Sequence, residues 1–458
     1  MAGRKCTRAF KNNMGRHTST PSEELPPGYK MTELGPLPEG WKVARLGDLF
    51  EIQQGKALSP KARAGARKRP FLRTANVLWG RIDLSALDEM HFEKEEEKRL
   101  ALIPGDLLVC EGGDVGRTAL WEGQLPLMLY QNHLHRLRAA RADIAPLFYM
   151  YWMQAAWTLF DIYGGTGNRT TIPNLSKSRL AALLAPLPPL PEQQAIAEIL
   201  RAVQRAKEAT DGVIAALREL KKSLMRYLFT YGPVPVDQAD QVALRETEIG
   251  PLPEGWEIMP LRRLGQISAG GSAPQGSHYF GGTHPFVRVQ HLDEDGYEVR
   301  RWDLITDEAV QRYRLRLFPP GTIVFPKSGA SIRLEKRAIL ARPSYLVSHL
   351  CAIIPNYDIV NGDFLFFALK RIPLAAEKAE GYPTLSLTEI GQRLVPLPPL
   401  SEQRAIAEIL RAVDRKMEAE EARRRALEAL FRTLLHDLMT ARLRLPQAFI
   451  TRFAEDAP

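Results

Sequence analysis

Cationic and amide side chains grouped in short polar segments are the residues of this sequence with the clearest chemistry. Arg pairs with the edge of guanine, Asn and Gln pair with adenine, and both Lys and Arg neutralise phosphates. The densest group is the loop at residues 61–69, which holds five cations in nine residues. We expect it to contact a phosphate backbone, the alternative being a solvated flexible loop. Its cations are Lys61, Arg63, Arg67, Lys68 and Arg69.

Two further polar segments in the first half carry side chains suited to reading bases. Gln131 and Asn132 stand directly before a histidine, and Asn168 and Arg169 lie in a glycine-rich loop at 164–171. Glycines let the main chain approach phosphates closely, while an ordinary connecting loop is the alternative for this segment. We expect all four polar side chains to be candidates for contact with a nucleic acid.

Arg73 and His133 differ from the other candidates because each recurs in the second half, as Arg288 and His349. A residue kept in both halves should be structural or should bind something common to two sites. We therefore expect a structural role for the histidine, and either a phosphate contact or a buried ion pair for the arginine.

The second half contains three candidate segments, each weighed against an ordinary charged surface. A polar, glycine-rich loop spans 270–279, a strand end lies near 288–291, and residues 327–333 follow an apolar strand. The side chains that we expect to contact a nucleic acid are Ser272, Gln275, His278, Tyr279, Arg288, Gln290, His291, Lys327, Ser328 and Arg333.

Motifs for catalysis and for metal binding are missing from the sequence. It contains no Asn/Asp-Pro-Pro-Tyr/Phe box, no GxGxxG, no Pro-Asp dipeptide and no HExxH. The stretch 111–118 follows an apolar strand but lacks the spacing and the lysine of a phosphate loop. The three cysteines form no CxxC pair, so we predict neither a zinc site nor a disulfide. We expect this chain to bind no cofactor or metal and to catalyse nothing by itself.

Size and charge agree with a multidomain protein that has a polyanionic partner. The chain has 458 residues, enough for two or three domains, and a formal net charge of +9. A basic balance suits nucleic acid first and an anionic membrane surface second. No apolar run is long enough for a membrane span, and cysteine usage fits a reducing compartment, so we expect a cytoplasmic protein.

An internal repeat organises the whole chain. The segment 32–41 (TELGPLPEGW) returns at 247–256, and the segment 187–209 returns at 397–419 with only five of 23 positions changed. Between these segments the two halves diverge, although landmarks such as Phe71-Leu72-Arg73 and Phe286-Val287-Arg288 persist. The pattern predicts one scaffold used twice, with different surfaces and two different targets.

Long helices and mixed domains are the elements that must position these residues. Apolar residues at three- and four-residue spacing from Ile196 to Leu228, and again from Ile406 to Leu438, predict two helices of about 40 residues. Helices of that length, roughly 60 Å, should pack on each other in antiparallel orientation as a coiled coil. Proline-rich runs end each preceding domain and start each helix. The regions 41–185 and 256–395 have short β-rich runs and short apolar helices, which predict two α+β domains.

Taken together, this arrangement resembles the specificity subunits of Type I restriction–modification systems. The two copies of PLPPLxEQxAIAEIL, at 186–200 and 396–410, and the two GPLPEGW boxes carry the resemblance, which covers roughly 33–441. It implies two target recognition domains that read a bipartite duplex, separated by a pair of spacer helices related by a pseudo-twofold axis. It also implies partner subunits for modification and restriction, which would hold S-adenosylmethionine, ATP and Mg.

The resemblance gives the domain boundaries and a partner surface. We expect a disordered basic leader at 1–30, with the natural start possible at Met31. Recognition domains follow at 31–186 and 246–396, spacer helices at 187–232 and 397–444, a linker at 233–245 and a tail at 445–458. Equal segments on the two helices should bind equal partners, so we expect one modification subunit on each. The residues expected to contact them are Glu192, Gln193, Glu198, Arg201, Glu402, Gln403, Glu408 and Arg411.

Three other interpretations remain open. The chain could belong to a different multi-subunit restriction system with the same architecture. It could be a coiled-coil scaffold whose two domains bind two proteins, or, with least support, a stand-alone enzyme.

Overall fold

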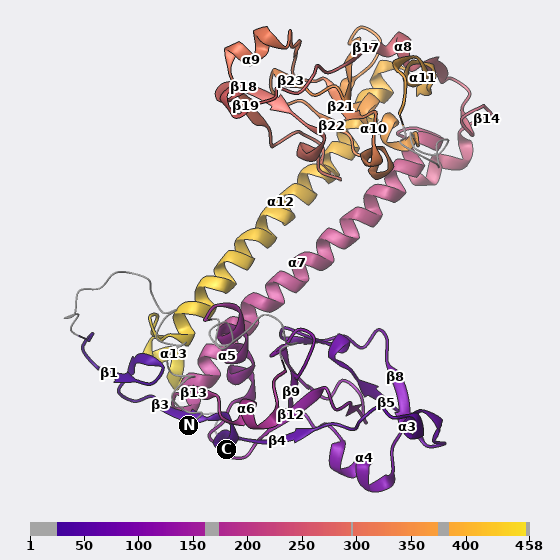
Figure 1. Ribbon diagram of the computed structural model, residues 1–458. Helices are drawn as coiled ribbons and strands as arrows, with labels where there is room; N and C mark the ends of the chain where they lie inside the picture. Colours follow the sequence, from indigo (N-terminus) through magenta and orange to yellow (C-terminus); the bar gives the residue numbers. More distant parts are fainter. Residues whose placement is uncertain (1–24, 161–173, 295, 374–383, 455–458) are drawn as a thin grey trace. The chain divides into compact units, whose positions relative to one another are not determined.

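Two compact units make up the chain in the computed structural model, which describes residues 25–160, 174–294, 296–373 and 384–454. The first unit is built from residues 1–209 and 424–458, and the second from residues 210–423. Each unit combines one α+β domain, called here the first or the second domain, with halves of two long helices (Figure 1). The predicted fold class is confirmed.

The long helices α7 (Leu190–Tyr231) and α12 (Leu400–Met439) are antiparallel within each unit. In the first unit Glu192 pairs with Arg444, and Lys207, fifteen residues further along α7, pairs with Glu428 at 2.7 Å. In the second unit Lys221 pairs with Asp414 at 2.5 Å, and Arg218, earlier on α7, lies 3.8 Å from Glu421, later on α12. The predicted antiparallel packing of these helices therefore holds in both units.

Buried positions along the helices follow a coiled-coil spacing. In the second unit the inward-facing residues of α7 lie three and four positions apart, as in a heptad seam. Val213, at 41% exposed, and Leu220, at 47%, belong to the predicted stripe but lie outside this seam. Ile409 and Leu430 belong to the stripe predicted for α12 and are likewise exposed. The α7 residues that form the seam are Ile214, Leu217, Lys221, Leu224 and Leu228.

The first domain contains two small sheets. Its four-stranded antiparallel sheet has the order β10-β9-β12-β4, and its three-stranded sheet has the order β11-β5-β8 with β11 and β5 parallel. The strands are β4 (Phe50–Gln54), β5 (Lys68–Leu72), β8 (Asp88–His91), β9 (Leu107–Cys110), β10 (Thr118–Leu120), β11 (Leu129–Tyr130) and β12 (Leu134–Ala139).

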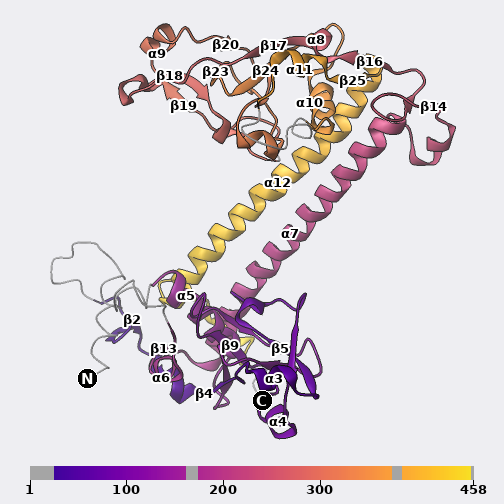
Figure 2. The same ribbon diagram turned by 45° about the vertical axis from the view of Figure 1, so that its right-hand side comes forward.

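The second domain repeats this topology with one additional strand, β20, and Figure 2 shows it from another side. Its sheets have the orders β17-β24-β21-β22 and β19-β18-β23-β20, and β18 and β23 are again parallel. The strands are β17 (Gly265–Ala269), β18 (Phe280–Val287), β19 (Asp303–Ile305), β20 (Leu317–Phe318), β21 (Ile323–Pro326), β22 (Ala338–Ile339), β23 (Ser344–Leu346) and β24 (Leu350–Pro355). One scaffold is therefore used twice, as the landmarks predicted.

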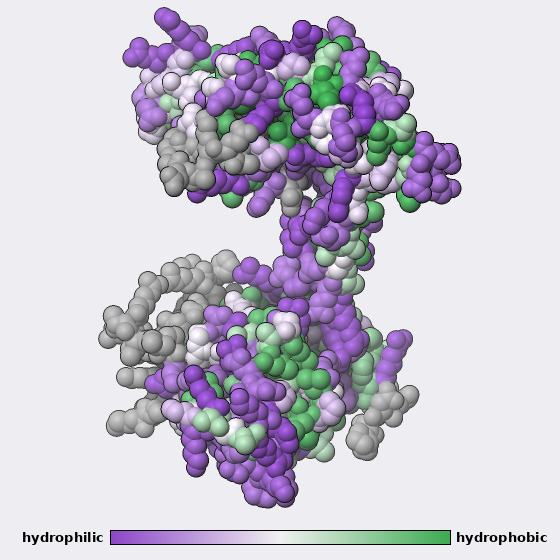
Figure 3. Space-filling model, turned by 90° about the vertical axis from the view of Figure 1, so that its right-hand side faces the viewer, coloured by the Kyte–Doolittle hydropathy of each residue, from purple (hydrophilic) through white to green (hydrophobic). Residues whose placement is uncertain are grey.

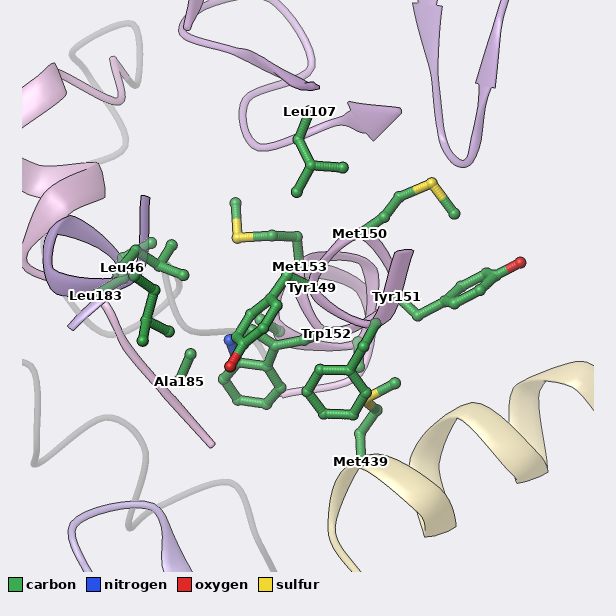
Figure 4. Packing of buried hydrophobic residues seen from close by; sticks show 14 of the residues in the cluster. Leu46, Leu107, Tyr149, Met150, Tyr151, Trp152, Met153, Leu183, Ala185 and Met439 are labelled. Atoms are coloured by element: carbon green, nitrogen blue, oxygen red, sulfur yellow. The ribbon is translucent and has the colours of Figure 1, made fainter. Parts of the chain in front are cut away.

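A helix that is apolar on nearly every side fixes each domain on the long helices. In the first domain this is α5 (Pro146–Thr158), which is buried from Phe148 to Met153. Tyr149, Trp152 and Met153 lie close to Leu107 of β9, to Ala185 and to Met439 of α12 (Figure 4). Ala185 directly precedes residues 186–193, which are called here the hinge of the first domain; residues 396–403 are the hinge of the second. The counterpart of α5 in the second domain is α10 (Gly362–Arg371). A helix buried on all faces belongs to a core, so each domain and its helix halves share one core.

The proline-rich runs form strands as well as ending the domains. β13 (Leu184–Leu187) pairs antiparallel with β3 (Lys42–Arg45), and β25 (Leu394–Leu397) pairs with β16 (Glu257–Pro260). Proline is tolerated here because each ribbon has only two strands and therefore two open edges. Each domain thus begins and ends on neighbouring strands, and its long helix starts three residues later.

The predicted boundaries differ from the observed elements at several ends. β1 (Tyr29–Thr32) begins inside the expected leader and pairs with β2 (Gly35–Pro38). The expected linker contains the short helix η2 (Val236–Gln241), and the expected tail contains α13 (Gln447–Thr451). Residues 1–24 of the leader lie outside the described part of the chain.

The long helices are predominantly hydrophilic on the side seen in Figure 3. Across the described residues, no helix combines the length and the apolar character required to cross a membrane.

Candidate nucleic-acid interface

The repeated arginines form the same ion pair in both domains. Arg73 Nη1 lies 2.9 Å from Asp88 Oδ2, and Arg288 Nε lies 2.7 Å from Asp303 Oδ2. These arginines are 40% and 32% exposed, and both carboxylates are partly exposed. Of the two roles weighed from the sequence, the structure shows the ion pair, although it is only partly buried.

The turn after each of these arginines is also repeated, with different side chains. The Arg73 amide donates to Asn76 Oδ1 at 2.9 Å, and the Arg288 amide donates to His291 Nδ1 at 3.0 Å. His291 is 7% exposed, and burial lowers the pKa of its imidazole. His291 therefore caps this turn, as Asn76 does in the first domain. Little of its surface is left for contact with a nucleic acid.

The cation-rich segment predicted as a loop is ordered and divided between two roles. Arg67 and Arg69 both pair with Glu97, each at 2.5 Å, which lowers the pKa of that carboxyl. Lys61 and Arg63 lie exposed on the short helix α3 (Pro60–Ala64), and Lys68 is exposed at the start of β5. The last three remain the better candidates for phosphate contact because no described carboxylate pairs with them.

Gln131 and Asn132 lie where β4 and β11 end side by side. Gln131 is 7% exposed, and its main chain pairs with Lys56. A Cβ on Gly55 would lie 2.4 Å from the Gln131 carbonyl, and one on Gly270 would lie 2.3 Å from the matching Val347 carbonyl. Glycine therefore permits this close approach in both domains, and Gln131 is held mainly by its main chain.

The repeated histidines share main-chain bonds and have exposed side chains. The His133 carbonyl accepts from the Glu111 amide, and the His349 carbonyl accepts from the Lys327 amide, both at 2.9 Å. Both imidazoles are exposed, and His349 Nδ1 lies 2.6 Å from Ser328 Oγ. The structural role expected for the histidine thus belongs to its main chain.

Glu111 and Lys327 occupy equivalent positions with opposite charge, a pairing that the sequence prediction did not include. Both directly follow the strand that pairs with the start of β12 or β24. Their carbonyls accept from the amides of Leu175 and Leu385, at 2.9 and 2.8 Å. Aligning the repeat through Gly113 and Gly329 could have found this pair. The candidates Asn168 and Arg169 lie outside the described residues.

Gln54 is a second residue that the sequence prediction missed. Its Nε2 donates to Glu111 Oε2 at 2.7 Å and to the Asn132 carbonyl at 2.8 Å. Both amide hydrogens are thereby used, so the remaining capacity of this exposed side chain is its carbonyl oxygen, an acceptor. The first domain thus presents an oriented acceptor beside Glu111, whose counterpart in the second domain is Lys327.

The glycine-rich loop of the second domain carries exposed polar and aromatic groups. Ser272, Gln275 and His278 are exposed, and the His278 ring packs at a tilt against Tyr279 with ring centroids 3.9 Å apart. Tyr313 Oη accepts from the Gln275 amide at 2.8 Å, which fixes the loop. The two other candidates with exposed side chains are Gln290 and Arg333.

Four of the residues expected to bind partner subunits have internal roles. Trp41 Nε1 donates to Glu192 Oε2 at 2.8 Å, and Trp256 Nε1 donates to Glu402 Oε2 at 2.9 Å. Gln193, at 0% exposed, and Gln403, at 1%, each donate to two main-chain carbonyls and accept from one amide. Contact between the GPLPEGW box and the hinge is therefore enough to explain why these residues repeat.

The repeated helix arginines also contact the chain itself. Arg201 pairs with Glu122 of the first domain, and Arg411 stacks on the Tyr297 ring of the second with 3.3 Å between Cζ and the centroid. Glu198 is partly exposed, and Glu408 is exposed. Of the eight expected partner contacts, these two glutamates are the ones for which no hydrogen bond, ion pair or cation–π contact is seen within the described residues.

The stretch that faintly resembled a phosphate loop is an ordinary turn. Arg117 is held by Asp114 at 3.0 Å and by the Thr74 carbonyl at 3.0 Å. Among the described residues, no cluster of three or more His, Cys, Asp or Glu side chains is placed to hold a metal ion.

Comparison with known proteins agrees with the fold and with the repeat. A family model described as the Type I restriction modification DNA specificity domain matches residues 38–219 and again 253–429. A Methanocaldococcus jannaschii protein named as a type I restriction enzyme MjaX specificity subunit is 27% identical over 430 residues, covering 91% of this chain and 97% of its own length. The MjaIX specificity subunit of the same organism is 25% identical over 385 residues, covering 81% of this chain and 86% of its own.

A solved structure supports the same fold. The crystal structure of the Type-I restriction-modification system S subunit from M. genitalium aligns with a TM-score of 0.58 at 17% identity. The alignment covers 87% of this chain and 96% of that one. Since the family model matches both repeats and well over half of the chain, this protein belongs to the Type I restriction–modification DNA specificity subunits, which select the DNA sequence and do not catalyse its modification.

Proposed function

We propose that the two domains read the two halves of a bipartite DNA target, the first through hydrogen-bond acceptors and the second through donors. The observation that carries this proposal is one scaffold with opposite chemistry at one place. Glu111, which holds the amide of Gln54, stands in the first domain where Lys327 stands in the second, beside Ser328. No comparable observation supports the alternative function, a coiled-coil scaffold whose two domains bind proteins.

The base preference follows from this chemistry. The oriented carbonyl of Gln54 suits an exocyclic amino group, which cytosine and adenine present in the major groove. The ammonium of Lys327 suits the O6 and N7 acceptors of guanine. The domain would be positioned on phosphates by the exposed side chains of Lys61, Arg63 and Lys68. Contacts of this kind do not distinguish one base from another.

The experiment uses the protein assembled with its modification subunits, after methylation-sensitive sequencing has identified the target. Gln54→Leu should relax one position of one half-site by about 1–3 kcal/mol, and Lys327→Met should relax one position of the other. Lys61→Ala should instead weaken binding to all sequences and lower the salt slope by about one. Unchanged base preference in both Gln54→Leu and Lys327→Met would contradict the proposal.

The protein acts with DNA and with the other subunits of its restriction–modification system. We further propose one modification subunit on each helix repeat, docked on Glu198 with Ile199 and on Glu408 with Ile409. Support comes from identity between the two segments and from the exposure of Ile409, at 37%. On this proposal, S-adenosylmethionine, ATP and Mg²⁺ are held by the partners, and the assembly works in the cytoplasm.

The stoichiometry is testable with matched variants. Glu198→Arg alone and Glu408→Arg alone should each leave a complex with one modification subunit, because only one of the two surfaces is lost. The double variant should leave none, as measured by native mass spectrometry of co-expressed subunits. Arg404→Ala, on an exposed position of α12, is the control. Loss of both partners from a single variant would contradict independent docking.

A further inference from the structure

Arg201 and Arg411 occupy the same repeat position and contact different parts of the two domains. Arg201 reaches Glu122, which follows β10 in the first domain. Arg411 reaches Tyr297, in the segment that joins β18 to β19 in the second. Both arginines lie nine residues beyond the Glu-Gln pair that fixes the start of the helix. Each domain is thus held twice, at its hinge and again further along its helix.

The contact in the second unit is the more extensive. Tyr297 is 7% exposed, packs edge-on against Phe366 of α10 at 4.9 Å, and donates from Oη to Asp363. Main-chain bonds between Tyr297 and Ile339, at 2.8 Å, and between Val299 and Ile339, at 3.0 Å, hold this segment on β22. The ring beneath Arg411 therefore belongs to the rigid part of the domain.

A second contact lies further along the same helix. Arg300 Nη2 lies 2.8 Å from Glu418 Oε2, seven residues beyond Arg411 on α12. Because the same short segment touches α12 at points two turns apart, it fixes the angle of the second domain against its helix. These contacts add to the core packing of α10 against the long helices.

We propose that Arg411, with Tyr297 and the Arg300–Glu418 pair, is a positioning device that sets which distance between the two half-sites the protein accepts, and that Arg201 with Glu122 does the same for the first domain. This inference rests on the proposed bipartite reading. These residues touch no base, so they act on spacing and leave the bases of each half-site unchanged. The repeat keeps the arginine in both helices because each domain needs a second contact.

The test measures binding of the assembled methyltransferase to duplexes whose half-sites are separated by the natural spacer or by one base pair more or fewer. Arg411→Ala should reduce the preference for the natural spacer by about five- to thirtyfold, the equivalent of one desolvated cation–π contact. Arg411→Lys should reduce it too, because an ammonium lacks the flat, delocalised face with which a guanidinium packs on an aromatic ring. Tyr297→Phe retains the ring and should retain the preference, as should the control Arg404→Ala.

The weaker ion pair gives a second test with little risk to folding. Arg300 is 50% exposed and Glu418 is 34% exposed. Arg300→Glu alone should loosen the spacing preference, and adding Glu418→Arg should restore it. An equal fall in affinity at all three spacings in Arg411→Ala would overturn the inference, and so would an unchanged preference. If the wild-type protein binds equally well to a duplex in which one half-site is replaced, the proposed function itself is contradicted.

Discussion

His135 is fully buried beside the candidate interface, and its burial has a consequence for stability. Its Nε2 donates to the Leu175 carbonyl at 2.9 Å, and removal from water lowers the pKa of the imidazole below its ordinary value of 6.5. As the pH falls through that value, the unfolded chain takes up a proton that the folded chain refuses. Stability should therefore fall from neutral pH downward.

The variant His135→Gln lacks this titration and should lose less stability than the wild type between about pH 7.5 and pH 5.5. Urea unfolding followed by tryptophan fluorescence would measure the difference, since Trp41, Trp121 and Trp152 lie in the same unit. Equal losses in the two proteins would contradict the prediction.

Single residues were predictable where the repeat compares them directly. Arg73 and Arg288 align at one offset, and an ion pair was one of two roles predicted for them. Glu111 and Gln54 were missed because their meeting depends on strands that lie far apart in the sequence. Which residues of distant strands meet depends on the order of the strands in the sheet. That order cannot be read from the spacing of residues along the chain.

At the scale of elements, the periodicity predicted both long helices, but its placement of Val213 and Leu220 in the buried stripe of α7 was wrong. Val213 and Ile214 are adjacent and both apolar, so either fits a helical stripe. Only packing against α12 selects Ile214, at 4% exposed, for the seam. The closing strands β13 and β25 were missed because prolines at their third positions favour a turn or a break.

The Lys221–Asp414 pair lies in this seam and should govern its stability. Lys221 is 15% exposed and Asp414 is 6% exposed, so removing either one leaves a charge that is poorly hydrated. Lys221→Met should destabilise the second unit by about 3 kcal/mol. The double change of Lys221→Met with Asp414→Leu should be close to neutral, because no unpaired charge remains. Thermal unfolding of the four proteins measures the coupling, and purely additive losses would contradict it.

At the scale of the whole molecule, the first unit is built from two separate stretches of chain. Residues 1–209 lack Phe431, Leu435, Leu438 and Met439, which complete its core. A fragment ending at 209 should therefore be insoluble or bind a hydrophobic dye. Co-expression with 424–458 should restore a soluble complex that co-purifies. A fragment 1–209 that is monomeric and folded alone would contradict this division.

The pairing of β3 with β13, and of β16 with β25, has a meaning for how such proteins change over generations. Main-chain hydrogen bonds join the strands that open and close each domain, and they depend little on which side chains the strands carry. A recombination event that replaces everything between 46 and 183 leaves both ends of the insert on the same ribbon and the same helix. New DNA preferences can therefore be inherited as whole cassettes, with both long helices passed on unaltered.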